Sequence, residues 1–128
     1  MILDSSAICA AVLDEPERDE FGRRMNEASF VGIGAPTLVE AAMVLSSWLG
    51  EGADRLIAAA LADADVVILD FGRDHWREAL SAWTRFGRGR HPARLNFGDC
   101  LAYATARAAN EPLLEKGGDF ALTDIMLA

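Results

Sequence analysis

The sequence lacks the features of disulfide-rich, zinc-binding and membrane-spanning proteins. It has two cysteines in 128 residues, Cys9 and Cys100, which lie far apart among apolar neighbours. We therefore expect neither a disulfide framework nor a structural zinc site, and predict two small buried thiols. No run approaches the roughly 18 uncharged apolar residues of a membrane span, and the N-terminus resembles no signal peptide. We expect a cytoplasmic protein without membrane contact.

Positive charge is also scarce. The chain has 12 Lys and Arg against 20 Asp and Glu, which gives a net charge of −8 and a pI near 4.6. This balance argues against a nucleic-acid partner, because polyanion binding normally requires a basic surface. Residues 79–98 are the exception, since they contain no acid. They carry four arginines and a histidine: Arg85, Arg88, Arg90, Arg94 and His91.

Short apolar segments alternate with helical ones along a chain of single-domain length, 1–128. Strands are predicted at 1–3, 31–33, 66–69 and 112–114. Helices are predicted at 7–13, 17–28, 36–49, 54–64, 73–86 and 97–109. This alternation predicts an α/β fold in which a short parallel sheet is flanked by helices on both faces.

Four acids are expected at the edge of this sheet where parallel strands end and ligands usually bind. Asp4 and Asp119 follow the first and last strands, and Glu40 and Asp99 lie in the first turns of helices that start there. Each has a simpler explanation by itself: Asp4 as a helix cap, Asp119 as a turn residue and Asp99 as a partner of the helix dipole. Glu40 also fits a capping box with Thr37, although Pro36 competes with that register.

The surroundings of Glu40 and Asp99 favour a shared site over four separate explanations. Glu40 lies in the apolar run 38–45 with no base three or four positions away, and the nearest base to Asp99 is Arg94. A carboxylate in apolar surroundings is costly unless a cation compensates its charge. Oxygen ligands suit Mg²⁺ or Mn²⁺, so Asp4, Glu40, Asp99 and Asp119 are predicted to bind one or two such ions.

Four segments in this order resemble the PIN-domain ribonucleases, and most of all the VapC toxins of bacterial toxin–antitoxin pairs. They are MILDSSAI (1–8), TLVEA (37–41), LNFGDCLAYA (95–104) and KGGDFALTDI (116–125). The resemblance implies a PIN-like fold, a catalytic role for the four acids, and accessory roles for Ser6, or its neighbour Ser5, and Asp124. Glu115 and Gly118 depart from the usual pattern of these relatives.

The same resemblance implies a metal-dependent endoribonuclease toxin that hydrolyses phosphodiester bonds in tRNA or a structured rRNA. It further implies a VapB-type antitoxin as partner, a homodimer with contacts near 7–13 or 41–48, and a toxin–antitoxin hetero-oligomer. Arg85, Arg88, Arg90 and Arg94 are then predicted to bind RNA phosphates, with a solvated loop as the alternative. His91 is a candidate substrate contact, whereas His75 is expected to be a surface or core-edge residue in the middle of its helix.

Two other classes of protein remain open. A phospho-receiver module would use Asp70, at the end of strand 66–69, as phosphoryl acceptor with Lys116 nearby. Ser5 and Ser6 stand where receivers usually carry paired acids, which argues against that class. The remaining alternative is an interaction protein without catalytic activity.

Overall fold

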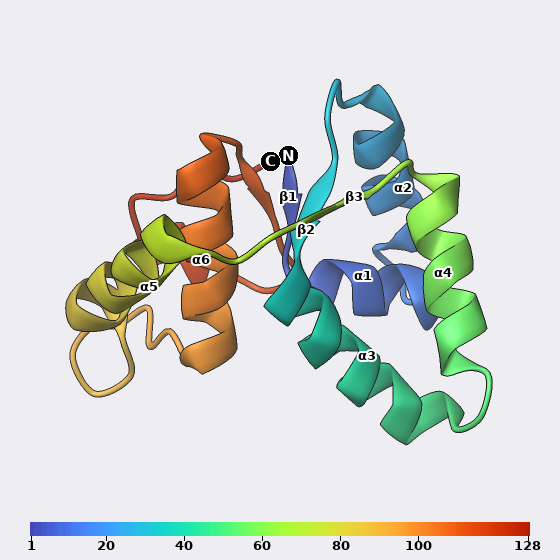
Figure 1. The fold of residues 1–128 in the computed structure, drawn as a ribbon, viewed down its shortest axis with the longest axis horizontal. Helices are drawn as coiled ribbons and strands as arrows, with labels where there is room; N and C mark the ends of the chain where they lie inside the picture. Colours follow the sequence, from blue (N-terminus) through green and yellow to red (C-terminus); the bar gives the residue numbers. More distant parts are fainter.

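The computed structural model describes all 128 residues and contains a four-stranded sheet between two groups of helices (Figure 1). The strands are β1 (Ile2–Leu3), β2 (Gly32–Gly34), β3 (Val67–Leu69) and β4 (Leu113–Leu114). They lie in the order β3-β2-β1-β4 and every neighbouring pair is parallel. The predicted α/β fold with a short parallel sheet is confirmed.

The helices divide between the two faces of the sheet. They are α1 (Ser5–Val12), α2 (Arg18–Glu27), α3 (Ala35–Leu49), α4 (Ala53–Asp63), α5 (Arg73–Phe86), α6 (Phe97–Ala109) and the short 3-10 helix η1 (Phe120–Leu122). Figure 1 shows α5 and α6 on one side and α1 to α4 on the other. None of these helices combines the length and the apolar character needed to cross a membrane.

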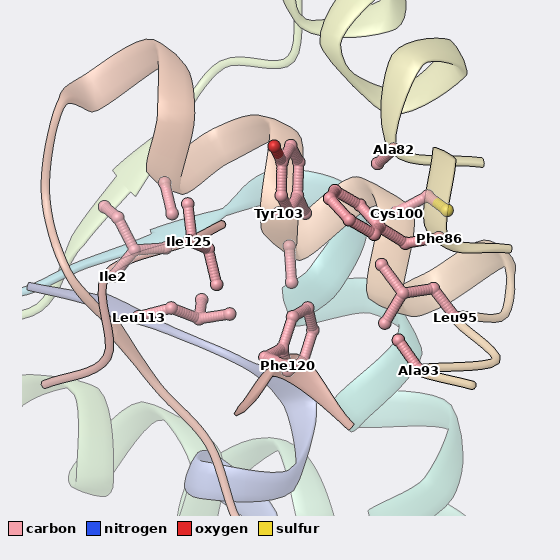
Figure 2. Packing of buried hydrophobic residues seen from close by; sticks show 12 residues of the cluster. Ile2, Ala82, Phe86, Ala93, Leu95, Cys100, Tyr103, Leu113, Phe120 and Ile125 are labelled. Atoms are coloured by element: carbon pink, nitrogen blue, oxygen red, sulfur yellow. The ribbon is translucent and has the colours of Figure 1, made fainter. Parts of the chain in front are cut away.

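Strand alternation fills a core on each face. Ile2 and Leu113 are register partners and pack with Phe86, Tyr103 and Phe120 on the α5–α6 side (Figure 2). The next residues along the two strands are also partners and join a second cluster with α1 and α2. Because successive side chains of a strand face opposite sides, strands of only two residues supply both cores.

The covering of the sheet is incomplete at its edge strand. Val67 and Ile68 of β3 are 46% and 52% exposed, although their apolar sequence resembles that of a buried strand. β3 has β2 as its only neighbour, and the chain then crosses directly to α5 (Figure 1). An edge position therefore leaves part of this apolar strand in solvent.

The two segments expected at a subunit contact differ in exposure. In α1, Ala7 and Ile8 are buried in the core of the chain itself, so most of segment 7–13 is not free surface. Cys9, expected to be buried, is only half-buried there, whereas Cys100 is buried, and both thiols are free. In α3, by contrast, Trp48 is 75% exposed. Only the α3 segment keeps an exposed apolar face.

Candidate active site

The predicted acids gather at one edge of the sheet. The strands β1, β2 and β4 end there, and α1, α3 and α6 begin there, at the lower edge in Figure 1. The charges of Asp4, Asp119 and Glu40 all act on Asp99. The structure thus brings together the four acids expected from the sequence, and we call them, with Glu115, the carboxylate cluster.

Asp4 is a helix cap and also presents an unsatisfied oxygen. Its Oδ2 accepts hydrogen bonds from the Ser6 backbone N at 3.0 Å and from the Ser6 hydroxyl at 2.6 Å. Its Oδ1 is buried without a hydrogen-bond partner, and the residue is only 6% exposed. Ser6 Oγ also accepts from the backbone N of Lys116 at 2.9 Å, which ties the end of β1 to the turn after β4. The capping role therefore leaves one carboxylate oxygen available to a cation.

Asp99 is held by a reciprocal cap at the start of α6. The Asn96 backbone N donates to Asp99 Oδ2 at 2.6 Å, and the Asp99 backbone N donates to Asn96 Oδ1 at 3.0 Å. Burial raises the pKa of Asp99 to about 6, with further increases from the neighbouring acids, while the hydrogen bond from Asn96 opposes the shift. The carboxylate is thus fixed in position but is electrostatically unfavourable when charged.

The capping-box explanation of Glu40 is wrong. Helix α3 begins at Ala35, after Gly34 as its cap, so Glu40 lies in the second turn, and Thr37 is fully buried. The Glu40 carboxylate packs against Gly98, where an added Cβ would lie 2.2 Å from Oε1. A capping box does exist at this edge, but it is the one formed by Asn96 and Asp99.

Glu40 is another carboxylate without compensation. Its Oε2 is buried and has no hydrogen-bond partner. Burial raises the pKa of Glu40 above its usual range, the Ser5 hydroxyl lowers it, and the charge of Asp4 raises it further. Both serines that follow Asp4 therefore act on acids of the site.

Glu115 adds a fifth acid. Burial raises the pKa of this half-buried side chain to about 7, and the charges of Asp4, Asp119 and Asp99 add to the shift. Asp119 itself is exposed, and the neighbouring Gly118 leaves open space around its backbone. Glu115, which departs from the usual pattern of the relatives, thus adds negative charge to the cluster.

The carboxylate cluster has no cation of its own. None of its five acids forms an ion pair, and the nearby Lys116 instead pairs with Glu15 at 2.8 Å and Glu17 at 3.2 Å. No three His, Cys, Asp or Glu side chains lie close enough to ligate one ion together. The cluster is therefore an open arrangement of oxygen ligands, and its unpartnered atoms fit Mg²⁺ or Mn²⁺ in chemistry.

Asp124 is not brought to this cluster. Its Oδ1 accepts from the Tyr103 hydroxyl at 2.6 Å and its Oδ2 from the Arg85 guanidinium at 2.7 Å. Burial alone would raise the pKa of Asp124, but the bonds from Tyr103 and Arg85 outweigh it and lower that pKa. Asp124 and Arg85 thus join the C-terminal segment to α5 and α6, which gives both a structural role, while the accessory role of Asp124 and RNA binding by Arg85 stay predictions.

The other three arginines of the basic segment are free. Arg88, Arg90 and Arg94 are exposed and form no ion pair, and the guanidinium of Arg90 lies 5.9 Å from the Trp83 ring centre. His91 shapes this loop, because its Nδ1 accepts from the Ala93 backbone N at 3.2 Å. These contacts leave three cations available to a ligand.

His75 lies within α5, as expected, but in its first turn and not in its middle, and its side chain is half-buried. Its Nδ1 accepts from the Gly72 backbone N at 3.0 Å, and its ring packs on Phe71. This histidine caps the helix and is not part of the carboxylate cluster.

The topology excludes a phospho-receiver site. Asp70 follows β3 and Lys116 follows β4, and these strands form opposite edges of the sheet. Lys116 is engaged by Glu15 and Glu17. The two residues that such a site would combine are thus kept apart.

Comparisons with known proteins agree with this geometry. The family model described as PIN domain matches residues 1–125. Ribonuclease VapC from Mycolicibacterium smegmatis is 35% identical over 125 residues, covering 98% of this chain and 97% of that protein.

Two solved structures share the fold. The crystal structure of VapC20 from Mycobacterium tuberculosis, described as a sarcin-ricin loop cleaving toxin, has a TM-score of 0.75 at 18% identity and covers 99% of this chain and 97% of that one. A toxin–antitoxin complex from Klebsiella pneumoniae has a TM-score of 0.70 at 16% identity, covering 99% and 95%.

Proposed function

This chain belongs to the PIN-domain family, among its VapC-type ribonuclease toxins, and we propose that its carboxylate cluster cleaves RNA with the aid of Mg²⁺ or Mn²⁺. The observation that carries this proposal is the set of buried, unpartnered oxygens, Asp4 Oδ1 and Glu40 Oε2, beside acids of raised pKa. Such an arrangement is unfavourable for the chain alone and is relieved by a divalent cation.

Asp4, Asp99 and Asp119 are the proposed ligands of the ion, and their side chains would have to move closer together than they lie in this structure to bind it jointly. When bound, such an ion would supply Lewis-acid polarisation of the scissile phosphate and a water molecule of lowered pKa. Ser6 and Asn96 hold Asp4 and Asp99 through their second oxygens and fix where the ligand atoms lie. Glu40 would orient the attacking water. As the P–O bond to that water forms, the P–O bond to the leaving oxygen breaks, and the proton that the water loses ends on the leaving oxygen.

We propose an RNA with an accessible loop, either tRNA or a structured rRNA, as substrate. VapC20 is described as cleaving such a loop. Arg88, Arg90 and Arg94 supply the phosphate contacts that an overall charge of −8 would otherwise disfavour. An enzyme acting on these RNAs works in the cytoplasm.

A VapB-type antitoxin is the proposed partner, as in the toxin–antitoxin pairs of this family. It would cover the carboxylate cluster and supply the missing positive charge. We also propose a homodimer through the outer face of α3, where Val39, Met43 and Trp48 are exposed. Both assemblies are built on surfaces that the chain leaves open.

The test is cleavage of cellular RNA by the purified chain without its partner, followed by sequencing of the new RNA ends. We expect discrete cleavage sites with Mg²⁺ or Mn²⁺ and none with EDTA. Cleavage that continues unchanged in EDTA would contradict the metal-dependent reaction. The absence of any cleavage would favour an interaction protein without catalytic activity.

A further inference from the structure

A pocket of about 480 Å³ lies between α5 and α6, and its link to the carboxylate cluster is Asn96, the cap partner of Asp99. Its walls include Trp83 of α5, Arg88 of the connecting loop, and Asn96 and Phe97 at the start of α6. We call it the α5–α6 pocket. It is largely apolar, and it has one free cation in its wall.

Phe97 forms a ridge between this pocket and the site acids. It is 78% exposed, more than any other large apolar side chain of the chain. On its other side lies a groove of about 740 Å³ between α3 and α6, which Glu40 and Gly98 also line. An aromatic ring so exposed loses the burial that usually stabilises it, and its two open sides suit a flat ligand.

Asn96 joins the pocket to the carboxylate cluster. The same residue lines the pocket and forms the reciprocal cap with Asp99, with hydrogen bonds of 2.6 and 3.0 Å. The pocket wall and a proposed metal ligand are thus held rigidly within one helical turn. A ligand in the pocket would therefore have a fixed position relative to Asp99.

The charge around the pocket favours an anionic ligand. Arg88 lines the pocket, is exposed and forms no ion pair, and the Arg90 guanidinium lies 5.9 Å from the Trp83 ring centre. A nucleotide combines a flat base for the aromatic rings with a phosphate for a free guanidinium. A purely apolar peptide would match the rings but leave Arg88 unused.

We propose that the α5–α6 pocket binds one unpaired nucleobase next to the scissile phosphate. The base stacks on Phe97 and contacts Trp83, and Arg88 binds the adjacent phosphate. This inference rests on the proposed function and specifies its substrate: the nucleotide in the pocket must be unstacked, so the site selects a loop or single strand. Because stacking accepts any base, the pocket selects an unpaired nucleotide and discriminates only weakly between base types.

The first test is the affinity for a short fluorescein-labelled single-stranded RNA of mixed sequence, measured by anisotropy in an Asp99→Asn background that prevents cleavage. Phe97→Leu keeps the apolar volume but loses the ring, and we expect binding to weaken by about 5-fold or more. Phe97→Trp should restore it. The matched control is Trp76→Leu, because Trp76 is 51% exposed on α5 and does not line the pocket.

Salt dependence separates stacking from charge. Phe97→Leu should leave both the slope of affinity against salt and the melting temperature unchanged, whereas Arg88→Ala should reduce that slope by about one unit. Equal RNA affinities for the parent and Phe97→Leu would overturn the proposal, as would an equal loss of affinity in Trp76→Leu. A pocket used only by a protein partner would give the first of these results.

The second test removes the base instead of the ring. A set of RNAs each carries one abasic nucleotide, at a different position in each RNA. At one of these positions the missing base should weaken binding to the parent, and the same RNA should bind Phe97→Leu no more weakly than the intact RNA does. Additive losses would overturn the assigned contact. Cleavage by the chain with Asp99 intact is measured separately, so a failure of the pocket and a failure of the metal-dependent reaction give different results.

Discussion

The carboxylate cluster and the α5–α6 pocket share a boundary at Asn96 and Phe97 but are built in opposite ways. The cluster is partly buried, mutually repulsive and fixed by helix caps, with unpartnered oxygens on Asp4 and Glu40. The pocket is open, apolar and bordered by a free arginine. The proposed catalytic residues should therefore destabilise the chain without its cation, whereas the proposed substrate-binding residues should have little effect on its stability. Substitutions in the two regions should therefore separate stability from activity.

The largest expected effect is the loss of cleavage on neutralising a proposed ligand. Asp4→Asn or Asp99→Asn should lower the cleavage rate by about 100-fold or more, because the ion loses a ligand. In Asp99→Asn the new amide oxygen can still accept the hydrogen bond from the Asn96 backbone N, so the fold should persist. Without metal at pH 8, Asp99→Asn should be more stable by about 1 kcal/mol after solvent screening.

Cleavage rates and urea unfolding in EDTA check both halves of this prediction. Asp54→Asn, an exposed acid in the first turn of α4, is the matched control and should change neither. Full activity in both cluster variants would remove the cluster from the reaction.

Glu40→Gln is expected to have the next largest effect. It should lower turnover by roughly 10- to 100-fold, because Gln cannot act as a charged ligand or orient water in the same way. Stability should change by less than about 1 kcal/mol, since Gln fits the same space beside Gly98. Gly98→Ala should also reduce turnover, because the new Cβ would lie 2.2 Å from Glu40 Oε1. Unchanged turnover in both variants would return Glu40 to a packing role.

Removal of two free arginines should affect binding and not chemistry. Arg88→Ala with Arg90→Ala should weaken binding to all RNA sequences alike and reduce the salt slope by roughly one to two units. Turnover of bound RNA should change little, because the carboxylates remain. Titrations at several salt concentrations measure the slope, and an unchanged value would leave these arginines as a solvated loop.

The smallest expected effect is the pH dependence of stability without metal. The pKa values of Asp99, about 6, and Glu115, about 7, lie above those of unfolded chains, so the folded chain binds more protons between pH 4 and 7. Their stabilising contribution is complete below pH 4 and is lost as pH rises through 6 and 7. The free energy of unfolding in EDTA should be roughly 1–2 kcal/mol lower at pH 8 than at pH 5, after solvent screening.

Glu115→Gln is the variant that sharpens this result. It should remove the part of the decline between pH 6 and 8, because the group that titrates there is gone. A decline that is the same in Glu115→Gln and in the parent would show that Glu115 does not titrate in this range. Melting curves at several pH values in EDTA provide the comparison.

The sequence predicted those features that depend on local pattern. Alternating strands and helices predicted the parallel sheet, and the position of acids at strand and helix ends predicted that they would meet. The exact helix start was harder to predict, because proline fits either of the first two positions. That shift decides whether Glu40 is a cap or a site residue. The spacing of Asn96 and Asp99 fits a capping box, although the local role predicted for Asp99 was only that of a partner of the helix dipole.

Features that depend on packing between distant segments were not predictable. Asp124 looked like a site acid by its motif, yet it pairs with Arg85, 39 positions earlier. Phenylalanine is a residue type that is usually buried, and only the placement of α5 and α3 on either side of Phe97 leaves it exposed. No local pattern carries this information, because burial is decided by the neighbouring helices.

The most direct test of the account is the melting temperature of the chain with Mn²⁺ and with EDTA. If the carboxylate cluster destabilises the chain until a cation binds, Mn²⁺ should raise the melting temperature by several degrees. Asp54→Asn should show the same rise, and Asp4→Asn should show little or none. An equal rise in Asp4→Asn, or no rise in the parent chain, would contradict the claim that this cluster holds the catalytic ion.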